Sequence, residues 1–203
     1  MPDQDDVARV TAFYPVADIT PAEFERFVVE LLGSVAPLVD DLETRLHDKV
    51  EGVDGVYDFD ATVRFRFGGM SFLTVVEAKR YTGPIKRALV QILHAKLQSV
   101  GAQKAVMIAT APYQSGALNY AKTHGIALVT VTEGRFTYEA RSAGGLSAMS
   151  REEARLRLGS PDFVGHTYGI GDDHNATRVT RLTPDAPEYV AEELFGIGRP
   201  PTT

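Results

Sequence analysis

Hydrophobic and polar residues alternate along the segment from Val56 to Phe67. One face of this segment carries only apolar side chains, namely Phe59, Ala61, Val63, Phe65 and Phe67. An alternation of this kind predicts a half-buried β-strand. The Gly68-Gly69 dipeptide that follows fits a two-residue hairpin turn, so residues 70–80 are expected to form the return strand.

Three other segments have the spacing of helices. Thr20-Pro21-Ala22-Glu23 combines an N-cap, a first-turn proline and a capping-box glutamate, and the apolar repeat that follows runs to Gly33. A second helix is predicted from Thr82-Gly83-Pro84 to about Val100, and a third over residues 115–124. The short apolar runs 104–110 and 126–132 are typical of buried strands.

Strand, helix and strand in this order predict a parallel pair joined by a crossover. We therefore expect an α/β fold, a mixed sheet with helices on both faces. Residues 46–50 are expected to form a short edge strand, and residues 159–182, rich in Gly, Asp and His, a loop. A last helix should follow Thr183-Pro184 and end near Gly196. This predicts a domain over residues 20–140 and a C-terminal extension of unknown role over residues 141–203.

Composition narrows the class of protein. The 203 residues include no Cys, so disulfides and Cys-based metal sites are excluded. No apolar stretch is long enough for a transmembrane helix, and the acidic N-terminus is unlike a signal peptide, so we expect a cytoplasmic protein. The net charge of −6 is unevenly spread: residues 61–104 carry eight basic groups and one acidic group. Such a basic block attracts anions such as phosphate.

The hairpin register brings charged residues together. With Gly68-Gly69 as the turn, Asp60 lies opposite Glu77 and Asp58 opposite Lys79. Opposed carboxylates repel each other, and a divalent cation bound between them would explain the pair. Glu77 and Lys79 share a strand face, so Asp60, Glu77 and Lys79 suit metal-assisted phosphodiester hydrolysis. The alternative is a cross-strand charge ladder in which Lys79 pairs with Asp58.

Two segments resemble a known family: 52–60 (Gly-Val-Asp-Gly-Val-Tyr-Asp-Phe-Asp) and 76–81 (Val-Glu-Ala-Lys-Arg-Tyr). They are similar to the Mrr-type restriction endonuclease domain of the PD-(D/E)XK nuclease superfamily, and the similarity covers roughly residues 20–135. The resemblance implies a restriction-endonuclease-like core with the order αβββαβαβ and a Mg²⁺-dependent DNA endonuclease, with Mn²⁺ as a possible substitute. It assigns the catalytic roles to Asp60, Glu77 and Lys79, and metal binding to Asp60 and Glu77.

Secondary candidates surround this group. They are Glu25 on the first helix, Asp58 as an alternative aspartate, and Gln91 on the second helix. The residues expected to contact DNA phosphates are Arg80, Lys86, Arg87 and Lys96. The expected partner is DNA, with a homodimer or a separate recognition protein as a possible addition. Three functions stay open: a restriction or defence endonuclease, a structure-specific nuclease of the junction-resolvase kind, and a non-cleaving nucleic-acid-binding or assembly module.

Overall fold

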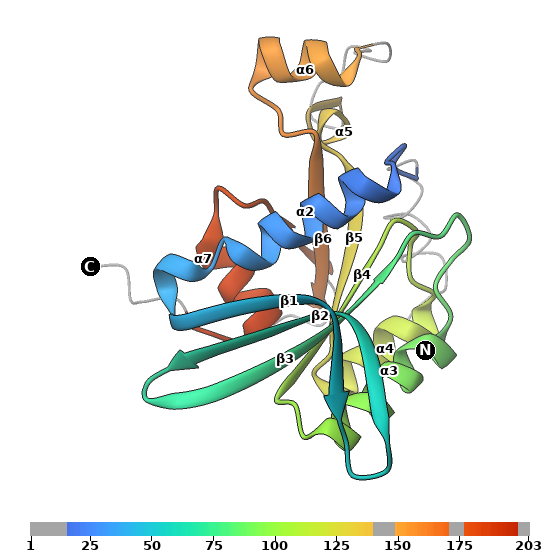
Figure 1. Cartoon of the computed structure of the whole chain (residues 1–203). Coiled ribbons are helices and arrows are strands. Elements are labelled where there is room, and N and C mark those ends of the chain that lie inside the picture. The colour runs from blue at the N-terminus through green and yellow to red at the C-terminus, as the bar shows by residue number, and fades with distance from the viewer. Residues whose placement is uncertain (1–15, 140–148, 171–176, 199–203) are drawn as a thin grey trace.

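A seven-stranded mixed sheet forms the centre of the protein, with its strands in sequence order from β1 to β7 (Figure 1). The computed structural model describes residues 16–139, 149–170 and 177–198. The strands are β1 (Asp40–Glu51), β2 (Val56–Phe67), β3 (Met70–Lys79), β4 (Lys104–Ala109), β5 (Ala127–Glu133), β6 (Phe163–Ile170) and β7 (Thr177–Leu182). The helices are α2 (Pro21–Gly33), η1 (Ala36–Leu38), α3 (Arg87–Val100), α4 (Ser115–His124), α5 (Gly134–Glu139), α6 (Arg151–Leu158), α7 (Pro187–Val190) and η2 (Ala191–Phe195).

The first three strands form an antiparallel meander. Pairing of β2 with β3 runs from Phe67 opposite Met70 to Ala61 opposite Val76, which is the register expected from the Gly68-Gly69 turn. Both glycines have positive φ, 58° and 80°, as the type I′ form of a two-residue hairpin turn requires. Strands β1 and β2 bend together near their middle, so the β1–β2 turn and the β2–β3 turn point to different sides (Figure 1).

Strands β3, β4 and β5 are parallel, and helices cover both faces of the sheet, as expected. α3 and α4 pack on one face, where Val90 and Leu93 meet Val75 and Met107. α2 and η2 pack on the other face, where Leu31 and Leu194 join the core. The polar side of each helix stays in water, so burial of one apolar stripe per helix holds these layers together.

The expectation of a loop over residues 159–182 is wrong for most of the residues that the structure describes there, and residues 171–176 lie outside the described ranges. Residues 163–170 and 177–182 form β6 and β7, which extend the sheet beyond β5 in antiparallel fashion. Gly165 allows this, because a Cβ at that position would lie 2.8 Å from Cγ1 of Val129 on the core side. Described residues beyond 140 therefore add two strands and the helical segment 187–195 to the same sheet and core.

Several boundaries also differ from expectation. The edge strand β1 runs from Asp40 to Glu51 and is therefore longer than the expected strand over residues 46–50. The second helix starts at Arg87, because residues 81–86 form a loop in which Ile85 bridges to Tyr113. The last helical segment begins after Ala186 instead of directly after Pro184. No helix within the described ranges has the length and apolar character needed to span a membrane.

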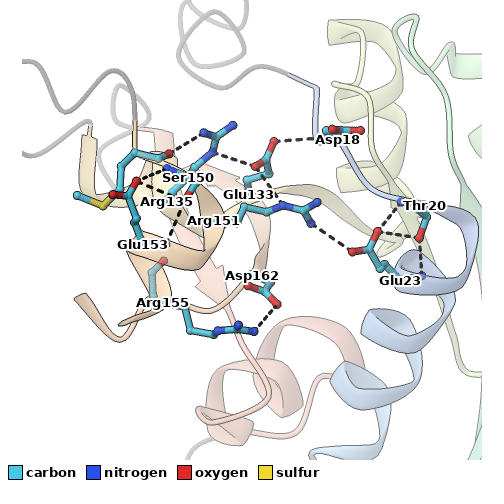
Figure 2. Close-up of polar contacts among 12 residues, drawn as sticks. Asp18, Thr20, Glu23, Glu133, Arg135, Ser150, Arg151, Glu153, Arg155 and Asp162 are labelled. Carbon is cyan, nitrogen blue, oxygen red and sulfur yellow. Dashed lines mark hydrogen bonds and ion pairs between the residues drawn. The ribbon is translucent and has the colours of Figure 1, made fainter. Parts of the chain in front are cut away.

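A polar network ties the C-terminal end of β5 to α2 and α6 (Figure 2). The buried carboxylate of Glu133 accepts hydrogen bonds from the backbone N–H of Asp18, at 3.3 Å, and from Nε of Arg135, at 2.9 Å. Arg151 on α6 lies 3.7 Å from Glu133 and 3.4 Å from Glu23. The network therefore fixes the start of α2, which carries Glu25, relative to the sheet.

Candidate active site

A fork between β2 and β3 creates the site. The ladder between these strands ends at Ala61 and Val76, and β3 continues alone beside β4 as far as Lys79. Asp60 is the first residue of β2 outside this ladder. Its carboxylate accepts a hydrogen bond of 2.7 Å from the backbone N–H of Ala78, so the side chain spans the fork.

Two lysines hold the two carboxylates. Nζ of Lys79 donates to Oδ2 of Asp60 at 3.2 Å and to Oε2 of Glu77 at 2.5 Å. Nζ of Lys96, on α3, donates to Oε1 of Glu77 at 2.6 Å and to the backbone oxygen of Asp58 at 3.0 Å. The expected juxtaposition of Asp60, Glu77 and Lys79 is present. Two ammonium groups offset the carboxylate repulsion, however, so the repulsion by itself is no argument for a bound metal.

The neighbouring carboxylates keep the side chain of Lys79 protonated. Burial disfavours its charged form, but the hydrogen bond and charge of Glu77, followed by those of Asp60, outweigh burial and raise the pKa of Lys79. Lys79 is therefore an ammonium ion at neutral pH. In this state it can stabilise negative charge on a phosphate.

The carboxylate pair fits a magnesium ion by its chemistry. Mg²⁺ is commonly held by one or two protein carboxylates together with water and substrate phosphate oxygens. Asp60 and Glu77 supply two such carboxylates, and oxygens of both lie within 3.2 Å of a single cationic atom, Nζ of Lys79. No ready-made group of three or more His, Cys, Asp and Glu side chains occurs among the described residues. The proposed Mg²⁺ site would therefore have the carboxylates of Asp60 and Glu77 as its protein ligands.

A small cavity of about 160 Å³ adjoins Asp60, and Glu25 lines it. The expectation that Glu25 lies near the carboxylate pair thus has a structural counterpart. His47 lines the same cavity, with Nε2 3.6 Å from Oε1 of Glu25, and has a left-handed φ of 48°. Sequence reasoning missed His47. Its position between the pairs Leu46–Ala61 and Asp48–Phe59 places it opposite Asp60, a relationship that only the β1–β2 register reveals.

Two secondary candidates lie outside this group. The Asp58 side chain is 75% exposed and pairs with Lys49 at 3.7 Å, so the alternative charge ladder, in which Lys79 pairs with Asp58, is wrong. The physical reason is the fork, since the β2–β3 ladder ends before it reaches Asp58. Gln91 is exposed on α3, more than one turn before Lys96, and lines neither the small cavity nor the larger one described below.

The four residues expected to contact phosphates occupy different environments. Arg80 lines the small cavity and donates to the backbone oxygen of Ile19 at 3.4 Å. Lys86 is exposed at the start of α3. The guanidinium of Arg87 lies 5.2 Å from the ring centre of Tyr120. Lys96 binds Glu77, so it belongs to the carboxylate group itself.

A mixed sheet flanked by helices, with an Asp…Glu-x-Lys group where β2 and β3 part, agrees with the resemblance to restriction endonucleases found in the sequence. Residues 16–134 match the family model Mrr_cat, described as restriction endonuclease. The match covers more than half of the chain, so this protein belongs to that family. The resemblance inferred from the sequence and the expected α/β fold are both confirmed.

Two solved structures are similar to this chain. One is a protein of unknown function, AF1548, with a TM-score of 0.42 and 19% identity, covering 51% of this chain and 54% of that one. The other is the DNA modification-dependent restriction endonuclease AspBHI, with a TM-score of 0.36 and 17% identity, covering 78% of this chain and 40% of that one. The chain thus spans about half of the first and two fifths of the second. A comparison with curated proteins gives no match.

Proposed function

We propose that this protein is a Mg²⁺-dependent DNA endonuclease that hydrolyses phosphodiester bonds in a restriction or defence role. The observation that carries the proposal is the position of Lys79, whose Nζ donates to both Asp60 and Glu77 at the fork. All three residues of the Asp…Glu-x-Lys pattern are present and in contact. That arrangement favours a cleaving enzyme over a non-cleaving binding module.

Each residue of the site has a role in the proposed reaction. Asp60 and Glu77 would hold the metal ion, which when bound polarises the phosphoryl oxygen and lowers the pKa of a coordinated water. Lys79 presents a fixed positive charge where the phosphate gains negative charge in the transition state. Lys96 holds the second oxygen of Glu77 and so orients that carboxylate. Arg80 and Lys86, both exposed, would contact the DNA backbone on the approach to the site.

Cleavage of both strands would require two such sites, so the proposal includes a homodimer that supplies the second site. Target choice could come from the same dimer or from a separate recognition partner.

A plasmid assay tests the proposal directly. Supercoiled DNA should be nicked or linearised with Mg²⁺ and left intact with EDTA. Lys79→Ala should abolish cleavage but retain most of the DNA affinity, measured in EDTA, because one cation among several is lost. Lys122→Ala, an exposed lysine in the last turn of α4, is the matched control and should cut normally. Binding without cleavage by the wild-type protein would favour the non-cleaving module instead.

A further inference from the structure

A second, larger cavity of about 750 Å³ lies beside the candidate active site. Arg80 lines both this cavity and the small one that contains Asp60, so the two are neighbours. The lining also includes Thr110, which directly follows β4, and residues 80–84, which directly follow β3. Its volume falls within the roughly 300–1,000 Å³ typical of small-molecule sites.

The walls of this cavity are tied to the catalytic strand. The backbone N–H of Thr110 donates to the oxygen of Lys79 at 3.1 Å, and its hydroxyl donates to the oxygen of Tyr81 at 2.8 Å. Ile85 joins the two surrounding loops, because its N–H donates to Pro112 at 2.8 Å and its oxygen accepts from Gln114 at 3.0 Å. The loops that line this cavity are therefore joined to β3 at Lys79.

The lining has the chemistry of a nucleotide site. Arg80 and Lys86 are cationic, and none of the lining residues is acidic. Leu89 and Pro84 are apolar, and the ring of Tyr81 is available because this residue is 45% exposed. Gln114 adds an amide that can donate and accept hydrogen bonds. Cations suit a phosphate, an exposed aromatic ring suits stacking on a base, and an amide suits the base edge.

We propose that this cavity receives one unpaired nucleotide of the DNA strand being cut, adjacent to the scissile phosphate. The inference rests on the proposed nuclease function. A base in an intact duplex cannot enter a cavity of this kind unless it leaves the stack, which costs least when the base is unpaired. The protein therefore prefers DNA that has an unpaired nucleotide beside the bond to be cleaved.

Two DNA duplexes test this proposal in EDTA, where binding is measured without cleavage. They are identical except that one carries a single bulged 2-aminopurine nucleotide. The wild-type protein should bind the bulged duplex roughly tenfold more tightly, since stacking of a base on an aromatic side chain supports a difference of this size. The 2-aminopurine emission should change on binding, because the base exchanges its neighbours for Tyr81.

Matched variants test whether the preference for the bulged duplex depends on the cavity. Tyr81→Ala should reduce the affinity ratio of bulged to paired duplex to near one, whereas Tyr81→Phe, which keeps the ring, should preserve it. Lys122→Gln should also preserve it, because Lys122 lies in the last turn of α4, at the opposite end of that helix from the cavity residue Gln114. Excess free deoxynucleoside monophosphate should not displace the bulged duplex.

Equal affinity of the wild-type protein for both duplexes would overturn the proposal, as would a preference that survives Tyr81→Ala. Complete displacement by the free nucleotide would overturn it in favour of a soluble-nucleotide site. These results are separable from the nuclease proposal. Mg²⁺-dependent nicking without a preference for bulged DNA removes the cavity proposal alone. A preference that depends on Tyr81 without any nicking removes the nuclease proposal, and it leaves the cavity as a binding site for an unpaired nucleotide beside no scissile bond.

Discussion

The carboxylate of Asp60 and the backbone N–H of Ala78 form a hydrogen bond of 2.7 Å directly beyond the last pair of the β2–β3 ladder. The Asp60 side chain thus accepts the hydrogen bond of a β3 backbone N–H at the point where backbone pairing between β2 and β3 ends. The bond fixes Asp60 next to the segment Glu77-Ala78-Lys79. The carboxylate pair is therefore preorganised by the sheet, and its geometry should respond to mutation in specific ways.

Asp60 and Asp58 should differ sharply in their contribution to cleavage. Asp60→Asn should lower the rate by about 10³-fold or more, because a weakened metal site forfeits several kcal/mol of transition-state stabilisation. Asp58→Asn should change the rate little, since that side chain is 75% exposed and pairs with Lys49. Initial rates of plasmid nicking at saturating Mg²⁺ measure both effects. A larger loss for Asp58→Asn would place the metal outside the fork.

Magnesium should stabilise the folded protein. A ligand that binds only the folded state at 100 times its Kd adds about 2.7 kcal/mol of stability. Thermal melts of the wild type with Mg²⁺ and with EDTA should show this gain, and Asp60→Asn should cancel most of it. In EDTA the variant should lie within about 1 kcal/mol of wild type, because it loses one partly exposed ion pair with Lys79. Equal Mg²⁺ shifts in the two proteins would contradict metal binding by Asp60.

Lys96 should act through Glu77 and not through DNA phosphates. Lys96→Met should lower the cleavage rate, since Glu77 loses a hydrogen bond of 2.6 Å, and leave the salt dependence of DNA affinity unchanged. Lys86→Met is the comparison, because loss of one phosphate contact should reduce the slope of log K against log salt by about 0.9. Titrations at several salt concentrations in EDTA measure the slopes. A reduced slope for Lys96→Met would make it a phosphate contact after all.

Stability should fall as the pH drops from about 6.5 to about 4, with His166 as a main cause. Burial first, and then the charge of Arg181, lower the pKa of His166 to about 4. In this window the unfolded chain binds a proton that the folded protein does not, so acid favours unfolding by at most about 3 kcal/mol.

Urea unfolding at pH 7 and pH 5 measures this effect, and His166→Asn should reduce the difference between the two. His94, whose pKa is lowered by burial and by His124, contributes with the same sign and should keep its share in the variant. An unchanged difference in His166→Asn would exclude His166 as a source of the acid sensitivity.

Local patterns in the sequence were sufficient to predict several helices and strands and to single out Asp60, Glu77 and Lys79. The alternation over residues 56–67 and the Gly68-Gly69 turn predicted β2, β3 and their register. The capping box at Thr20 predicted the start of α2. These features depend on neighbours in the chain, so a single sequence contains the information. The same register, extended by one pair, brought Asp60 toward Glu77 and identified the Asp…Glu-x-Lys group.

Tertiary structure decided what lies around that group. The β2–β3 ladder ends at Ala61 and Val76, so the hairpin register could not show that Asp58 lies beside Lys49 on β1 instead of Lys79. Lys96 reaches Glu77 only because α3 packs across β3. The strands β6 and β7 were missed because their Gly, His and Thr residues are suited to a loop until β5 pairs with them. Contacts between distant segments depend on how the layers pack, and no local pattern of residues encodes that packing.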